Sequence, residues 1–164
     1  MKLPAHTQIT ITPSPLGLLT LAAAGPNLVG VWFEDQAHFP DLSSFAHAPS
    51  YPVMQLAAEQ LTEFFAGQRT VFELPLDLTT GTAFQQAVWQ ALRGIACGYT
   101  CSYKAISERI GRPSAMRAVG AAVGRNPLSI IVPCHRVVAS SGALTGYAGG
   151  LERKTALLHL ESAL

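Results

Sequence analysis

The chain has 164 residues, of which 49% are hydrophobic and 13% are charged. A chain of this length and composition can bury a sizeable core, which excludes a disordered protein and predicts one or two small globular domains. No apolar run reaches the length that spans a bilayer, and the first ten residues lack the basic and apolar regions of a secretion signal. We therefore expect a cytoplasmic protein that does not enter a membrane.

The net charge of +1 conceals opposite charges on the two parts of the chain. Residues 1–80 carry two basic and seven acidic side chains, so two minus seven gives −5. Residues 81–164 carry nine basic and three acidic side chains, so nine minus three gives +6. A basic second part favours a polyanionic partner such as nucleic acid, although charges that only solvate helix faces would give the same count.

The three cysteines are Cys97, Cys101 and Cys134. An odd number of cysteines, all late in the chain, argues against a disulfide framework and favours reduced thiols. Cys97 and Cys101 lie four residues apart without a second pair of suitable ligands, so no metal site is predicted.

The first 80 residues predict an antiparallel sheet followed by one helix. Three strands of a meander are predicted from alternating or apolar runs at residues 7–12, 18–23 and 28–33. Apolar residues recur at helical spacing over 54–65 and predict an amphipathic helix that covers the sheet. Residues 35–50 are expected to be irregular, and residues 71–74 are a candidate edge strand. The domain boundary is placed at residues 80–81, where the periodicity lapses and the charge changes sign.

The second part predicts a mostly helical domain. The expected helices run from the capping box Thr82–Gln85 to Gly94, from Ser102 to Ile110, from Ser114 to Gly124 and from Leu151 to Leu160. The second and third are joined by a tight turn in which Gly111 can adopt a left-handed conformation, and this pair is typical of a helix-turn-helix. The apolar run 129–132 predicts a buried strand that ends at Pro133.

Cys134 and His135 are adjacent within the mostly apolar run 130–138. Only a thiolate is strongly nucleophilic, and an imidazole that takes the thiol proton makes it available near neutral pH. A buried, inert cysteine beside a structural histidine would show the same dipeptide. The dipeptide alone does not decide between a reactive pair and a structural one.

Further motifs flank the dipeptide in a fixed order. They are Thr82-Ala83-Phe84-Gln85-Gln86, Ser102-Tyr103, Arg117-Ala118-Val119-Gly120, Asn126-Pro127, Pro133-Cys134-His135-Arg136-Val137, Gly146-Tyr147, Gly149-Gly150 and Lys154. Together they resemble the signature of the O6-alkylguanine-DNA alkyltransferase family, and Pro15-Leu16-Gly17 and Phe64-Phe65-Ala66-Gly67 extend a looser resemblance to the first part. The resemblance implies a ribonuclease H-like α/β domain over 1–80, with an antiparallel sheet and a helix. A winged-helix-like domain with a helix-turn-helix would follow over 81–164.

The resemblance implies direct-reversal DNA repair, in which Cys134 accepts the alkyl group of O6-alkylguanine once and irreversibly. O4-alkylthymine is a further candidate substrate. His135 would draw the thiol proton through a water, and Glu161 would orient His135. Tyr103 would meet guanine N3 and offset the charge on the departing base. Asn126 would support the site by satisfying backbone groups.

The resemblance also implies double-stranded DNA as the partner, bound through its minor groove by the second helix of the helix-turn-helix. Arg117 would enter the base stack where the damaged nucleotide has been flipped out. The implied DNA-contacting residues are Ser102, Ala115, Met116, Arg117 and Ala118. The implied pocket residues are Val137, Tyr147, Ala148, Gly149, Gly150 and Lys154. Neither a cofactor nor a metal is implied, and a monomer is expected, with cooperative binding along DNA left open.

The sequence departs from the family pattern at positions that bear on substrate range. Met116 stands where a small alanine is common, Ala148 replaces a serine, and Ala96 and Tyr99 replace a proline and an acidic residue. Two alternatives stay open: a cysteine hydrolase that turns over repeatedly, and a non-catalytic sensor of alkylated bases. Such sensors lack the acceptor cysteine, which is present here as Cys134, so alkyl transfer is the preferred hypothesis.

Overall fold

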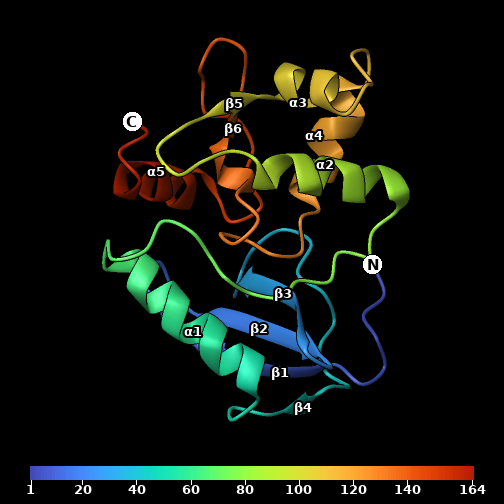
Figure 1. The fold of residues 1–164 in the computed structure, drawn as a ribbon, viewed down its shortest axis with the longest axis vertical. Coiled ribbons are helices and arrows are strands. Elements are labelled where there is room, and N and C mark those ends of the chain that lie inside the picture. The colour runs from blue at the N-terminus through green and yellow to red at the C-terminus, as the bar shows by residue number, and fades with distance from the viewer.

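A computed structural model describes residues 1–164 and places a sheet with one helix below a group of helices (Figure 1). The sheet consists of β1 (Gln8–Thr12), β2 (Leu19–Ala24), β3 (Asn27–Phe33) and β4 (Ala46–His47). Its order is β3-β2-β1-β4, with β1, β2 and β3 antiparallel as predicted. The short strand β4 pairs in parallel with β1, so the prediction that residues 35–50 are wholly irregular is wrong in this detail.

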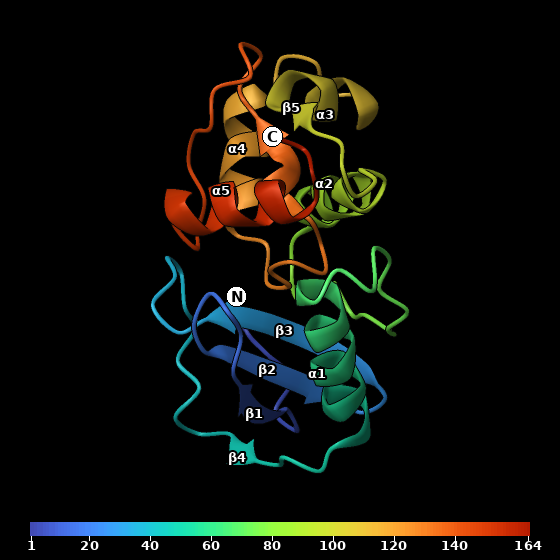
Figure 2. The same cartoon turned by 90° about the vertical axis from the view of Figure 1, so that its left-hand side faces the viewer.

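Helix α1 (Pro52–Phe65) lies against β2 and β3, as Figure 2 shows. Proline is tolerated at its first turn, where the backbone N–H groups have no partner within the helix. The predicted edge strand at 71–74 is wrong, because this stretch forms no ladder and only Leu76 makes an isolated bridge, to Leu28. The buried Gln60 side chain accepts from the N–H of Glu73 at 2.8 Å and donates to its carbonyl at 3.0 Å. A side chain thus takes the backbone groups that a strand partner would have used.

The second part is mostly helical, as predicted. It contains α2 (Ala83–Arg93), β5 (Cys101–Ser102), α3 (Tyr103–Arg109), α4 (Met116–Gly124), the short 3-10 helix η1 (Cys134–Arg136), β6 (Val137–Val138) and α5 (Leu151–Leu160). The capping box between Thr82 and Gln85 is formed. The two short strands β5 and β6 pair in parallel and place the start of α3 next to η1.

Helices α3 and α4 form the predicted helix-turn-helix. The Ser102 hydroxyl caps α3 by accepting from the N–H of Ala105 at 3.0 Å. Gly111 ends the helix in the left-handed region, at a φ of 72°. The prediction that Ser114 starts the next helix is wrong, because α4 begins at Met116 and its N-cap, Ala115, has no capping side chain.

The buried run 129–132 is not the predicted strand. Leu128 makes one isolated bridge with Val31, and the chain then turns, so that the N–H of Val132 donates to the carbonyl of Leu128 at 2.9 Å. Ile130 takes a left-handed φ of 73° within this turn. Hydrophobicity alone predicted the burial correctly, but it carried no information on the turn.

The two parts share one hydrophobic core. A single buried cluster extends from β2, β3 and α1 through the turn at 128–132 to α2, α4 and α5. Backbone hydrogen bonds join the parts as well, from Val31 to the carbonyl of Pro127 at 2.8 Å and from Ser129 to the carbonyl of Val31 at 3.0 Å. The sheet therefore supports the segment that leads to Cys134. None of the helices has the length and hydrophobicity that crossing a membrane requires.

Candidate active site around Cys134

Cys134 is the first residue of η1 and is only 4% exposed. Burial raises the pKa of its thiol, and this effect outweighs the opposing influence of the Asn126 amide and the Lys154 ammonium group. The thiol is therefore protonated near neutral pH. A nucleophilic role for Cys134 requires a base that removes the proton.

His135 and Glu161 meet in the interior although 26 residues separate them in the chain. His135 Nε2 lies 2.7 Å from Glu161 Oε1, and neither side chain is exposed. Burial lowers the pKa of His135 despite the nearby carboxylate, so the imidazole is neutral at neutral pH. Burial raises the pKa of Glu161, but hydrogen bonds from His135 and Arg136 outweigh it and bring the pKa to about 2.

This pairing determines which imidazole nitrogen is free to act as a base. An ionised carboxylate only accepts hydrogen bonds, so His135 Nε2 carries the hydrogen that is donated to Glu161. The lone pair then lies on Nδ1, which is buried and has no hydrogen-bond partner in the protein. His135 is thus held in the tautomer that can take a proton from a neighbouring thiol.

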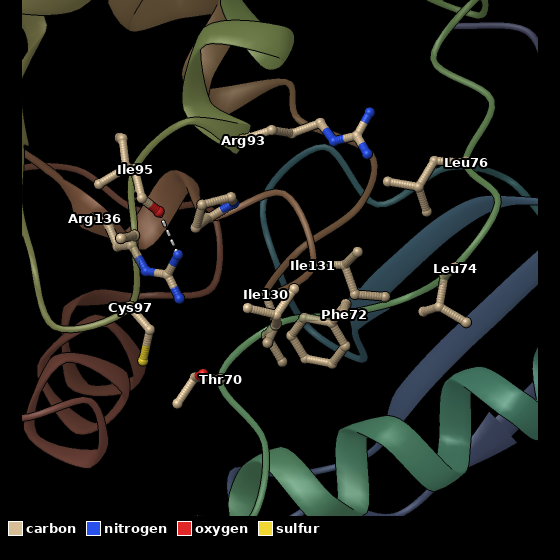
Figure 3. A pocket seen from close by; sticks show the side chains of 13 residues that line it. Thr70, Phe72, Leu74, Leu76, Arg93, Ile95, Cys97, Ile130, Ile131 and Arg136 are labelled. Atoms are coloured by element: carbon tan, nitrogen blue, oxygen red, sulfur yellow. Dashed lines mark hydrogen bonds between the residues drawn. The ribbon is translucent and has the colours of Figure 1, made fainter.

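Arg136 completes the charge network and was not predicted as a site residue. Its Nε and Nη2 donate to the two oxygens of Glu161 at 3.0 and 2.7 Å, and its Nη1 donates to the carbonyl of Ile95 at 2.6 Å. Figure 3 shows the guanidinium at the wall of a hollow of about 370 Å³ between the two parts, which Cys134 does not line. The available signal was one charged residue inside an apolar run, which suggests a buried ion pair but does not identify the partner.

Cys134 opens instead onto a cavity of about 230 Å³, here called the acceptor cavity. Its lining residues are Ala37, His38, Tyr103, Gly120, Val123, Gly124, Cys134, Gly146, Tyr147 and Ala148. The predicted pocket residues Tyr147 and Ala148 therefore line it. The other predicted pocket residues, Val137, Gly149, Gly150 and Lys154, are not part of its lining.

Lys154 lies behind the wall of the acceptor cavity and is fully buried. Its ammonium group donates to the carbonyls of Val137 at 2.6 Å, Thr145 at 3.0 Å and Gly146 at 3.2 Å. Burial lowers its pKa to about 8. Lys154 thus ties the loop around Gly146 to β6 and α5.

The structure places Tyr103 beside the acceptor cavity and Asn126 at the turn that precedes Cys134. The Tyr103 hydroxyl lies at the acceptor cavity and donates to the carbonyl of Thr145 at 3.2 Å, and burial raises its pKa, so it keeps its proton. The Asn126 amide donates to the carbonyl of Val132 at 2.8 Å and accepts from the N–H of Leu128 at 3.0 Å. Asn126 therefore holds the turn that delivers Cys134.

Comparison with known proteins agrees with this geometry. The family model for the 6-O-methylguanine DNA methyltransferase DNA binding domain matches residues 83–163, and that for the ribonuclease-like domain of the same family matches residues 9–78. A methylated-DNA–protein-cysteine methyltransferase of Mycolicibacterium paratuberculosis is 50% identical over 148 residues, which are 90% of this chain and 88% of that protein. The chain belongs to the methylated-DNA–protein-cysteine methyltransferase family.

Solved structures of this family have the same fold. A Mycobacterium tuberculosis O6-methylguanine methyltransferase matches with a TM-score of 0.88 and 46% identity, covering 96% of this chain and 93% of that one. A second structure of the M. tuberculosis protein, in complex with DNA, matches with a TM-score of 0.86 and the same identity and coverage. The protein is accordingly a DNA-binding methyltransferase of alkyl-transfer repair.

In this methyltransferase the predicted DNA-contacting residues lie on or next to the helix-turn-helix. Met116, Arg117 and Ala118 are exposed on α4, Ala115 is half-buried at its start, and the half-buried Ser102 caps α3. Further along the same helix, Gly120, Val123 and Gly124 line the acceptor cavity. One short helix therefore carries both an exposed outer face, formed by Met116, Arg117 and Ala118, and part of the wall beside Cys134.

The first part of the methyltransferase also reaches the site, which sequence reasoning did not predict. Ala37 and His38, from the loop after β3, line the acceptor cavity, and the N–H of Ala37 donates to the carbonyl of Ala148 at 2.8 Å. Arg153 on α5 donates to the carbonyl of Gly149 at 3.2 Å and pairs with Asp35 at 2.5 Å. No motif points to Asp35, Ala37 and His38, because they lie about a hundred positions before Cys134 in a segment without periodicity.

Proposed function

We propose that the protein repairs O6-alkylguanine in double-stranded DNA by transferring the alkyl group to Cys134 once and irreversibly. The observation that carries the proposal is the placement of the Cys134 thiol. It lies in a cavity lined also by Tyr103, next in sequence to His135, whose Nδ1 is free to act as a base. Few other reactions need a buried nucleophile together with a proton donor for a departing base.

In the proposed reaction, the thiol proton passes to His135 Nδ1, directly or through a water. The sulfur attacks the alkyl carbon, forming an S–C bond as the bond from that carbon to guanine O6 breaks. The electron pair moves onto the guanine ring, where the Tyr103 hydroxyl exchanges its hydrogen bond to the carbonyl of Thr145 for one to N3 and so offsets the negative charge. The proton lost by Cys134 balances the one that guanine regains. The product thioether has no leaving group comparable to guanine, so the protein acts once.

The burial of Cys134 requires that the damaged nucleotide leave the duplex. A thiol only 4% exposed cannot reach guanine O6 within stacked DNA, so the base enters the acceptor cavity by flipping. We assign the outer face of α4 to the minor groove, with Arg117 taking the place of the extruded base. The exposed position of Arg117 supports this assignment. We further propose that the protein acts as a monomer in the cytoplasm.

Mass spectrometry of the intact protein tests the proposal. After incubation with duplex DNA that contains O6-methylguanine, we expect a gain of one methyl group per protein, located on Cys134 by peptide analysis. The Cys134→Ala variant should gain none. Cys97→Ala is the matched control, because Cys97 is half-buried and lies away from the acceptor cavity, so this variant should react like the wild type. Duplex binding without modification of Cys134 would identify a lesion sensor, and repeated turnover would indicate a hydrolase.

A further inference from the structure

His38 lies at the border between two hollows. It is an exposed residue of the loop after β3, and it lines both the acceptor cavity and a neighbouring hollow of about 260 Å³, here called the side hollow. Gly124 is the only other residue that the two linings share. Glycine has no side chain, so His38 is the only residue with a side chain that the two linings share. His38 therefore lies where the two spaces adjoin, and its side chain is called the partition below.

The side hollow is large enough to matter for substrate size. Its volume is similar to the 230 Å³ of the acceptor cavity, and its wall includes Trp89, Gln85 and Asn126. The opening of this space to the acceptor cavity would roughly double the volume available beside Cys134. Most of the wall is polar and it includes Arg125, but Trp32 and Trp89 offer aromatic surface against which an aryl group can pack.

The loop holds the His38 backbone firmly. The N–H of the preceding residue, Ala37, donates to the carbonyl of Ala148 at 2.8 Å. Gln36 is buried, and its Oε1 accepts from the N–H of Phe33 at 2.8 Å and from the Ser129 hydroxyl at 3.0 Å. His38 itself has a left-handed φ of 60°, a conformation that histidine adopts more readily than most residues other than glycine. The partition is therefore a built part of the site rather than a mobile flap.

We propose that His38 sets the size of the alkyl group that Cys134 can accept. The inference rests on the proposed function, and it assigns a specificity-determining residue to the first domain. With the imidazole in place, the acceptor cavity holds guanine with a small O6 substituent. Without the imidazole, an O6-arylmethyl group extends into the side hollow while its reactive carbon still faces the thiol.

The test compares two substrates that differ only in the size of the adduct. The same duplex carries either O6-methylguanine or O6-benzylguanine, and the second-order rate constant of Cys134 alkylation is measured for each. We expect His38→Ala to raise the ratio of the benzyl to the methyl rate about tenfold, which is the scale of discrimination that pocket size supplies. His38→Trp should lower this ratio. His38→Asn, whose shorter side chain tolerates a left-handed φ, should raise the ratio even if His38→Ala disturbs the loop.

His47→Ala is the matched control, because His47 is an exposed histidine on β4 and lines neither hollow. Its ratio should equal that of the wild type. An unchanged ratio in all three His38 variants, or an equal loss of both rates, would show that His38 supports the loop without selecting substrates. If the wild type itself fails to take the methyl group, the proposed function fails. If the wild type reacts but the ratios do not move, only the role of His38 fails.

Discussion

The buried ion pair between Arg136 and Glu161 makes a quantitative prediction for stability. The exposed fraction of the Arg136 side chain is 7% and that of Glu161 is 0%, so neither charge can be solvated by water if its partner is removed. Breaking a buried pair from one side costs about 3–5 kcal/mol. For a protein of this size, about 2–4 °C of Tm corresponds to each kcal/mol. Arg136→Met and Glu161→Leu should therefore each lower the Tm by roughly 6–20 °C.

The double variant separates the ion pair from simple packing. Replacing both charges by apolar side chains leaves no buried charge, and such exchanges are often close to neutral. Glu161 also accepts the hydrogen bond from His135 Nε2, and losing this acceptor costs about 1–3 kcal/mol. We therefore expect the double variant to be about 2 kcal/mol less stable than the wild type and more stable than either single variant.

Urea and thermal unfolding of the four proteins measure this coupling. The exposed pair Arg69–Glu63, at 2.8 Å and with side chains 22% and 41% exposed, is the control. Glu63→Gln should change stability by less than about 0.5 kcal/mol, because water solvates the remaining charge. Single-variant losses below about 1 kcal/mol, or losses that simply add in the double variant, would refute the argument from burial.

Three further predictions concern pH and DNA. The pKa of Glu161 is about 2 in the folded protein, against an ordinary value of 4.5, so the ionised carboxylate stabilises the fold fully above pH 4.5 and this contribution is lost as the pH falls towards 2. In unfolding experiments, the stability difference between wild type and Glu161→Gln should shrink over this window. A constant difference would contradict the assignment. Burial lowers the pKa of His135 below 6.5, so the wild-type rate of alkyl transfer should fall at acid pH, where His135 is protonated, and be level at neutral pH. The rate of His135→Ala should be lower by about 10²-fold or more and should rise with pH towards the raised pKa of the Cys134 thiol. A pH profile of His135→Ala parallel to that of the wild type would exclude the imidazole as base. Arg117→Ala should slow alkyl transfer from duplex DNA about tenfold or more, because the duplex reaction includes base extrusion. Its reaction with free O6-methylguanine, which needs no extrusion, should be unchanged. Equal slowing of both reactions would place Arg117 in the cavity chemistry.

Features that depend on neighbouring residues could be predicted from the sequence. The capping box at Thr82 and Gln85 and the left-handed Gly111 are both present, because side chain and backbone meet within three or four positions. The meander follows from alternating or apolar runs that turn residues separate, and the amphipathic helix follows from its helical periodicity, because one face of α1 is buried. The ordered motifs around Cys134 and His135 were sufficient to predict the family.

The tertiary structure decided the features that depend on contacts between distant segments. The stretches 71–74 and 129–132 are apolar like strands, but buried amides of Gln60 and Asn126 satisfy backbone groups that a sheet would have used. Neither periodicity nor propensity includes these side-chain partners.

The active site also depends on contacts between segments that are distant in the sequence. The motif names Cys134 and His135, yet the free Nδ1 depends on Glu161, and Glu161 is kept ionised by Arg136. The wall at His38 comes from a different domain altogether. The chemical type of each residue is known from the sequence. The pKa of its side chain, its tautomer and the space beside it depend on neighbours that only folding brings into contact.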